Sequence, residues 1–167
     1  MAYRNNTYVA FDGDNDMWAY RYMKGWKQND NSTFDFYDAH ELSQARDTST
    51  EDSIKRSLRS RLSSSKVFVI LVGDSTKNLY KFVRWEIEQA ISLNLPIIVV
   101  NLNKKRCHDD LLCPPILDKH LAVHISYGAR IMQHALENWS SEYYKLQKEG
   151  VTGPRLYNNS IYTGYGL

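Results

Sequence analysis

The sequence has 167 residues, of which 43% are hydrophobic and 24% are charged, and its formal net charge is +2. This length suits one domain, and so small and dispersed a charge does not predict a nucleic-acid partner. No segment approaches the roughly 20 apolar residues of a membrane span, and the first residues lack a signal peptide's apolar core, so a cytoplasmic protein is expected. Cys107 and Cys113 are not spaced as CxxC, and with His108 they do not complete a zinc set, so we expect reduced thiols and no metal site.

Apolar runs alternate with segments of helical periodicity along the chain. Runs such as residues 67–72 and 96–100 are apolar throughout, which is typical of strands covered on both faces. In chain order, the expected strands are residues 7–11, 34–37, 67–72, 96–100 and 121–125. Helices are expected at about residues 16–28, 51–62, 78–94 and 127–148.

This alternation predicts an α/β fold, because right-handed crossovers between parallel strands cover both faces of a sheet. We expect a single flavodoxin-like, three-layer domain over residues 1–148, with a five-stranded parallel sheet of order 2-1-3-4-5. Residues 149–167 are expected to form a C-terminal tail that is extended or docks on a partner subunit. Ligands bind such sheets at the carboxyl ends of the strands, which makes the loops at residues 12–16, 38–50 and 73–78 the candidate site.

The helix expected after the third strand places one acidic residue on its apolar side. Phe82, Val83 and Ala90 flank Glu86 at helical neighbour spacing, whereas Glu88 points to the opposite side. A carboxylate that faces the core is costly unless a partner satisfies it, so Glu86 is a candidate functional residue. The alternative is that Glu86 lies at the edge of the apolar stripe and pairs with a surface Lys or Arg.

The same segment carries a family resemblance. A strand that ends in Gly-x-Ser/Thr, followed by an aromatic residue four positions before a Glu-Ile pair, resembles the third strand–helix unit of Toll/interleukin-1 receptor (TIR) domains that cleave NAD. Here Gly73, Ser75, Phe82 and Glu86 occupy these positions. To about residue 148, the chain resembles the TIR-like protein of bacterial Thoeris anti-phage systems. The other features that carry this resemblance are residues 8–11, Asp16, Trp26 and residues 64–73.

The resemblance implies an enzyme that consumes NAD as its substrate and needs no bound cofactor. Glu86 would be the catalytic residue, and Phe82, which stands where catalytic relatives often have Trp, would stack on the substrate. Cleavage of the nicotinamide–ribose bond would give an ADP-ribose-type signal, linear or cyclic, that activates a downstream effector. Self-association is also expected. The alternative is a non-catalytic TIR-like adaptor that acts through self-assembly.

The loops supply candidate substrate-binding residues. Phe11 is expected near the base, Asp12 or Asp14 near sugar hydroxyls, and Asp38 in the loop that covers the cleft in TIR domains. Ser75 belongs to a turn suited to phosphate, with a flexible glycine, hydroxyls and a following helix N-terminus.

The acidic loop at residues 12–16 has other interpretations. It could equally be a cluster that caps the next helix. A strand followed by Asp-x-Asp also resembles the start of haloacid-dehalogenase phosphatases, but Asp16 stands where those enzymes usually have Thr, and a long cap insertion is absent. A calcium-binding loop would need a Gly where Met17 stands and a Glu where Met23 stands.

Overall fold

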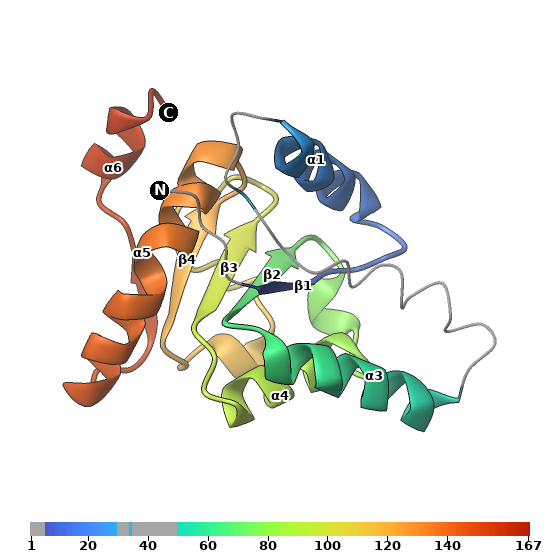
Figure 1. Cartoon of the computed structure of the whole chain (residues 1–167). Helices are drawn as coiled ribbons and strands as arrows, with labels where there is room; N and C mark the ends of the chain where they lie inside the picture. Colours follow the sequence, from blue (N-terminus) through green and yellow to red (C-terminus); the bar gives the residue numbers. More distant parts are fainter. Residues whose placement is uncertain (1–5, 30–33, 35–49) are drawn as a thin grey trace.

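The computed structural model describes residues 6–29, 34 and 50–167, which form a five-stranded, all-parallel sheet flanked by helices (Figure 1). The strands are β1 (Thr7–Ala10), β2 (Val67–Val72), β3 (Ile97–Asn101), β4 (Ala122–Ser126) and β5 (Pro154–Leu156). The helices are α1 (Met17–Gln28), α3 (Glu51–Ser64), α4 (Val83–Ser92), α5 (Ala129–Lys148) and α6 (Asn159–Gly164), with 3-10 turns η2 (Thr76–Asn78) and η3 (Pro115–Leu117).

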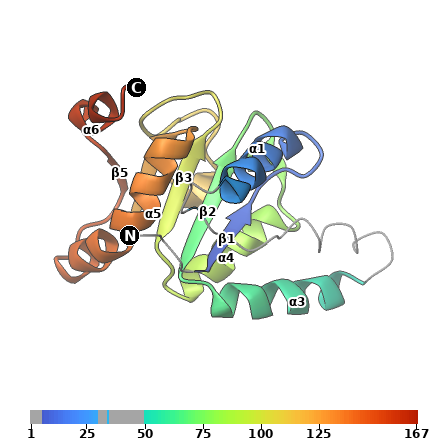
Figure 2. The same cartoon turned by 45° about the horizontal axis from the view of Figure 1, so that its top comes forward.

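Two hydrophobic clusters form the core, one on each face of the sheet. Side chains alternate along β2, so that Val69 packs with α1 and α5, whereas Ile70 packs with α3 and α4. Figures 1 and 2 show α1 and α5 on one face and α3 and α4 on the other. Strands β2 and β3 are buried along their whole length, as their continuous apolar sequences predict. The expected α/β fold with helices on both faces is therefore confirmed.

The strand order differs from the expected 2-1-3-4-5. The sheet runs β1-β2-β3-β4-β5, and each neighbouring pair is parallel. The expected second strand at residues 34–37 lies outside the described residues apart from Phe34, which belongs to no element. The fifth strand comes instead from the C-terminal segment, where β5 pairs with β4 in the register Ala122↔Pro154. The other four expected strands keep their expected neighbours, and the prediction missed β5 because this segment carries no apolar pattern that would mark a strand.

The C-terminal segment docks on its own chain. All three residues of β5 are exposed, but Tyr162 of α6 is fully buried and belongs to the cluster beneath α5. The Tyr162 hydroxyl accepts a hydrogen bond from the backbone N–H of Ser126 at 3.3 Å, and the guanidinium of Arg106 lies 4.2 Å from the centre of its ring. Arg130 at the start of α5 donates to the carbonyl of Tyr165 at 2.7 Å. Tyr162 and Tyr165 thus attach the segment to β4 and to the start of α5. Figure 1 shows α6 beside this end of α5.

Helix α4 is shorter than its sequence pattern suggests. It begins at Val83, after η2 and a turn, and it ends before Asn94, which adopts the left-handed conformation with φ of 54°. Asparagine tolerates this conformation better than most residues, so Asn94 turns the chain into β3. Within the described part of the chain, no helix has both the length and the apolar character needed to cross a membrane.

Candidate functional site

The carboxylate of Glu86 is buried between α4 and β1. Glu86 lies in the first turn of α4 and is 3% exposed, on the same side of the helix as Val83 and Ile87. The hydroxyl of Tyr8 donates a hydrogen bond of 2.6 Å to Oε2 of Glu86. This distance is that of a short O–H···O hydrogen bond. The helical arc read from the sequence therefore placed Glu86 correctly on the buried side, and not at an exposed edge.

Tyr8 is held in position by the sheet. It lies on β1, is fully buried, and stacks on Phe68 of β2 with ring centres 5.7 Å apart. Because side chains alternate along a strand, Tyr8 faces α4 while its neighbour Val9 faces the other core cluster. Sequence reasoning did not identify Tyr8 as the partner of Glu86, since 78 residues separate the two in the chain.

The two phenylalanines expected in one cleft lie on opposite faces of the sheet. Phe82 immediately precedes α4 and packs against the cluster on the α4 side. Phe11 packs against the cluster on the α1 side, stacked on Tyr20 with ring centres 4.6 Å apart. The structure thus brings Phe82, but not Phe11, to the side of the sheet that holds Glu86.

The loops after β1 and β2 meet at the carboxyl ends of their strands. Ser75 donates to Oδ2 of Asp12 at 2.8 Å, and the Asn15 side chain donates to the same oxygen at 2.8 Å. The backbone N–H groups of Asp14 and Asn15 donate to Oδ1 of Asp12. Asp12 is 2% exposed, and burial alone would raise its pKa, but these four hydrogen bonds outweigh burial and lower the pKa below its ordinary value. Asp12 is therefore ionised, and its hydrogen bonds hold the two loops together.

The pKa of Asp16 is shifted in the opposite direction, upward. It is 7% exposed, and its Oδ2 has no hydrogen-bond partner in the described part of the chain. Burial, together with the negative charges of Asp12 and Asp74, raises its pKa from 3.8 to about 6, against a hydrogen bond from Thr76 that lowers it. A Cβ placed on Gly73 would lie 2.4 Å from that same Oδ2, so the carboxylate approaches β2 only because residue 73 is glycine.

Among the predicted binding residues, the structure joins Asp12 and Ser75 directly. Asp14 is exposed and contributes its backbone N–H to Asp12. Asp38 lies outside the described residues. Asn15 and Asp16 were not predicted as site residues, although their place in a polar loop at the end of a parallel strand was a signal that could have identified them.

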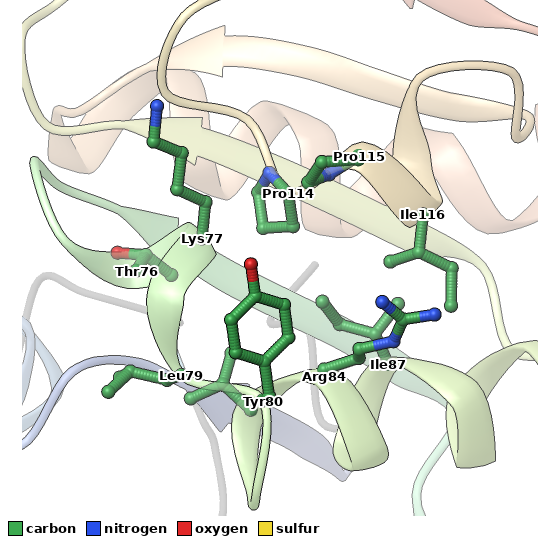
Figure 3. A pocket seen from close by; sticks show the side chains of 10 residues that line it. Thr76, Lys77, Leu79, Tyr80, Arg84, Ile87, Pro114, Pro115 and Ile116 are labelled. Atoms are coloured by element: carbon green, nitrogen blue, oxygen red, sulfur yellow. The ribbon is translucent and has the colours of Figure 1, made fainter.

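The hollows in the described part of the chain include the following two, neither of which is lined by Glu86. One lies between the start of α4 and residues 114–116, with Lys77, Tyr80 and Arg84 around it (Figure 3). Its space of about 10 Å³ is enough for a single water molecule but not for a nucleotide. The other is an open hollow of about 420 Å³ on α1, lined by Trp18, Arg21, Tyr22, Gly25 and Trp26.

Comparison with known protein families gives a match. A family model described as Thoeris protein ThsB, TIR-like domain, matches residues 8–107, which is more than half of the chain. The matched region includes Tyr8, Glu86 and both loops around Asp12 and Asp16. No curated protein matches the chain.

Proposed function

Because the chain belongs to the family of Thoeris ThsB TIR-like domains, and is thus a defence-related TIR-like protein, we propose that it is an enzyme that consumes NAD. It cleaves the nicotinamide–ribose bond and makes an ADP-ribose-type signal, linear or cyclic, for a downstream effector. Glu86 is the catalytic residue. The observation that carries this proposal is the buried Glu86 carboxylate, held by the Tyr8 hydroxyl at 2.6 Å.

The chemistry suits a single carboxylate. Glycosidases generally need a second carboxyl group to protonate a poor leaving group. Nicotinamide departs from a cationic ring as a neutral molecule, so NAD cleavage needs no such acid. One carboxylate, Glu86, can hold the ribose hydroxyls and stabilise the positive charge that develops on the ribose. Water attack then gives ADP-ribose, and attack by a group of the same molecule gives a cyclic product.

The surroundings of Glu86 support this role. The Tyr8 hydroxyl fixes one carboxylate oxygen, and an oriented carboxylate in a site with little water interacts more strongly with a developing cation than a solvated one does. Phe82 lies one helical turn before Glu86 and offers a ring for stacking on the substrate. The loops joined by Asp12 and Ser75 supply hydroxyl, amide and carboxylate groups at the carboxyl ends of β1 and β2, where polar parts of the substrate would bind.

The test compares Glu86→Gln with Glu88→Gln. Glu88 lies on the same helix but is exposed and pairs with Arg84 at 3.1 Å, so its substitution controls for changes to α4. Each full-length variant is incubated with NAD, alone and with extract of phage-infected cells, and the products are resolved by mass spectrometry. We expect nicotinamide release by the wild type and by Glu88→Gln, and none by Glu86→Gln. Full turnover by a folded Glu86→Gln protein would refute the assignment.

The second candidate function is a non-catalytic adaptor that self-assembles. The aromatic surface of α1 favours it, because Trp18 is 46% exposed and Tyr22 is 62% exposed beside the open hollow. Light scattering distinguishes the candidates when it is combined with the NAD assay. An adaptor forms assemblies that Trp18→Ala disperses, and it releases no nicotinamide under either condition.

A further inference from the structure

The segment between β3 and β4 gathers three potential metal ligands far from Glu86 in the sequence. A ring nitrogen of His108, the sulfur of Cys113 and a carboxylate oxygen of Asp118 all lie within 4.8 Å of one another. Cys113 is 3% exposed and packs with Leu117 against the α4-side face of the sheet, whereas Asp118 is exposed. One ligand is thus anchored in the core, and another is open to solvent, which gives an ion a route of entry.

His108 is oriented as a metal-binding histidine usually is. Its Nε2 lies 3.1 Å from Oδ1 of Asp118, and its Nδ1 lies 2.9 Å from Oδ1 of Asp110. A histidine that binds a metal through one nitrogen typically donates the proton on the other nitrogen to a carboxylate, which fixes the ring. Asp110 can fill that supporting role while Nε2 faces the ligand cluster.

The loop around the cluster is fixed before any ion arrives. Asp109 is buried, and its Oδ1 accepts hydrogen bonds from the backbone N–H groups of Leu111 and Leu112 at 2.9 and 3.0 Å. Its other oxygen accepts from Asn103 and pairs with Lys105 at 3.2 Å. These contacts hold the turn that leads from His108 to Cys113, so binding an ion requires little further ordering of the chain.

A buried histidine beside the cluster provides independent support. His124 of β4 is fully buried, and neither of its ring nitrogens has a hydrogen-bond partner in the described part of the chain. Its ring lies 5.0 Å from that of His108, centre to centre, at an angle of 71°. Leaving a buried polar group without a hydrogen bond is unfavourable, and such a group commonly marks a water or ion site.

We propose that His108, Cys113 and Asp118 bind a Zn²⁺ ion, with water in the fourth position. The ring of His124 borders this site, but its nitrogens lie outside the group of ligand atoms within 4.8 Å of one another. Zinc is bound by Cys sulfur, His nitrogen and Asp oxygen, usually four at a time, whereas Mg²⁺ and Ca²⁺ prefer oxygen ligands alone. The ion cross-links three residues of the segment between β3 and β4. The site is structural, and it does not depend on the function proposed for Glu86.

The test measures zinc retention by the full-length, tag-free protein. Chelator-treated protein is loaded with Zn²⁺, dialysed and analysed by elemental mass spectrometry. We expect one zinc per chain in the wild type and its loss in Cys113→Ser. Cys107→Ser is the matched control, because Cys107 is an exposed thiol in the same segment and lies outside the ligand cluster. Glu86→Gln should retain zinc as well.

Two further variants keep the proposal falsifiable if Cys113→Ser does not fold. Asp118→Asn alters an exposed ligand without disturbing the core, and it should weaken zinc binding at least tenfold. His124→Phe keeps a buried ring beside the site and should weaken zinc binding less than Asp118→Asn does. Replacement of zinc by Co²⁺ should produce a thiolate charge-transfer band that Cys113→Ser abolishes. A wild type that retains no zinc, or equal retention by the wild type and a folded Cys113→Ser or Asp118→Asn protein, would overturn the proposal.

Discussion

Substitution of Asp16 by Asn should stabilise the protein near neutral pH and leave it unchanged in acid. In the folded state, burial and the charges of Asp12 and Asp74 raise the pKa of Asp16 from 3.8 to about 6. The ionised form is therefore less favourable in the folded state than in the unfolded chain. Below pH 3.8, Asp16 is protonated in both states and has no effect on the free energy of unfolding.

The size of the effect follows from the same values. Between pH 3.8 and about 6, the unfolded chain releases the Asp16 proton first, so stability falls as the pH rises. Above about pH 6 the loss is complete, and at 1.36 kcal/mol for each pKa unit it amounts to about 3 kcal/mol. Asparagine keeps the shape of the side chain but cannot ionise, so Asp16→Asn should recover up to this amount. In a chain of this length, the gain corresponds to roughly 6–12 °C in the melting temperature.

The assay is chemical unfolding followed by tryptophan fluorescence at about pH 3 and pH 7.5, on either side of the titration. The matched control is Asp14→Asn, which removes an exposed carboxylate from the same loop and should change stability by less than about 0.5 kcal/mol. A gain for Asp16→Asn at both pH values, or a loss of stability at pH 7.5, would refute the electrostatic reasoning.

Three further substitutions test other contacts. Gly73→Ala should lower the free energy of unfolding by about 1–3 kcal/mol in a thermal melt, because the new Cβ meets Oδ2 of Asp16. The double variant Gly73→Ala with Asp16→Gly should recover most of this loss. An unaffected Gly73→Ala protein would contradict the contact. Tyr8→Phe should cost about 1–3 kcal/mol, since it removes the 2.6 Å hydrogen bond to a buried carboxylate, and this cost should shrink in a Glu86→Gln background when both are measured by urea unfolding. Tyr162→Ala should cost on the order of 3 kcal/mol and raise proteolysis after residue 149, whereas the exposed Tyr80→Ala should do neither; equal proteolysis of the two variants would show that the C-terminal segment is not held by Tyr162.

Features with a regular pattern could be predicted from the sequence. The apolar runs of β2 and β3 identified buried strands, and the helical arc around Glu86 placed this residue on the buried side of α4. The rule that ligand-binding loops follow parallel strands led to the loops that Asp12 and Ser75 join.

The rest depends on contacts between residues that are distant in the sequence. Strand β5 has three exposed residues and no alternation, so only its pairing with β4 defines it. The hydrogen bond between Tyr8 and Glu86 depends on how α4 packs against β1, and no local sequence pattern predicts this packing. His108, Cys113 and Asp118 do not match a known ligand spacing, because an irregular loop brings them together.

The contact of Arg106 with Tyr162 has a consequence for how the molecule opens. Arg106 belongs to the segment between β3 and β4, and Tyr162 is the fully buried residue of α6, so a single cation–π contact connects two peripheral elements. Opening of either element breaks this contact and makes the other easier to open. Such coupling is reciprocal, so the free energy by which one element protects the other is the same in both directions. Amide hydrogen exchange should therefore show protection lost together in residues 102–108 and 157–165 when Arg106 is replaced by Ala.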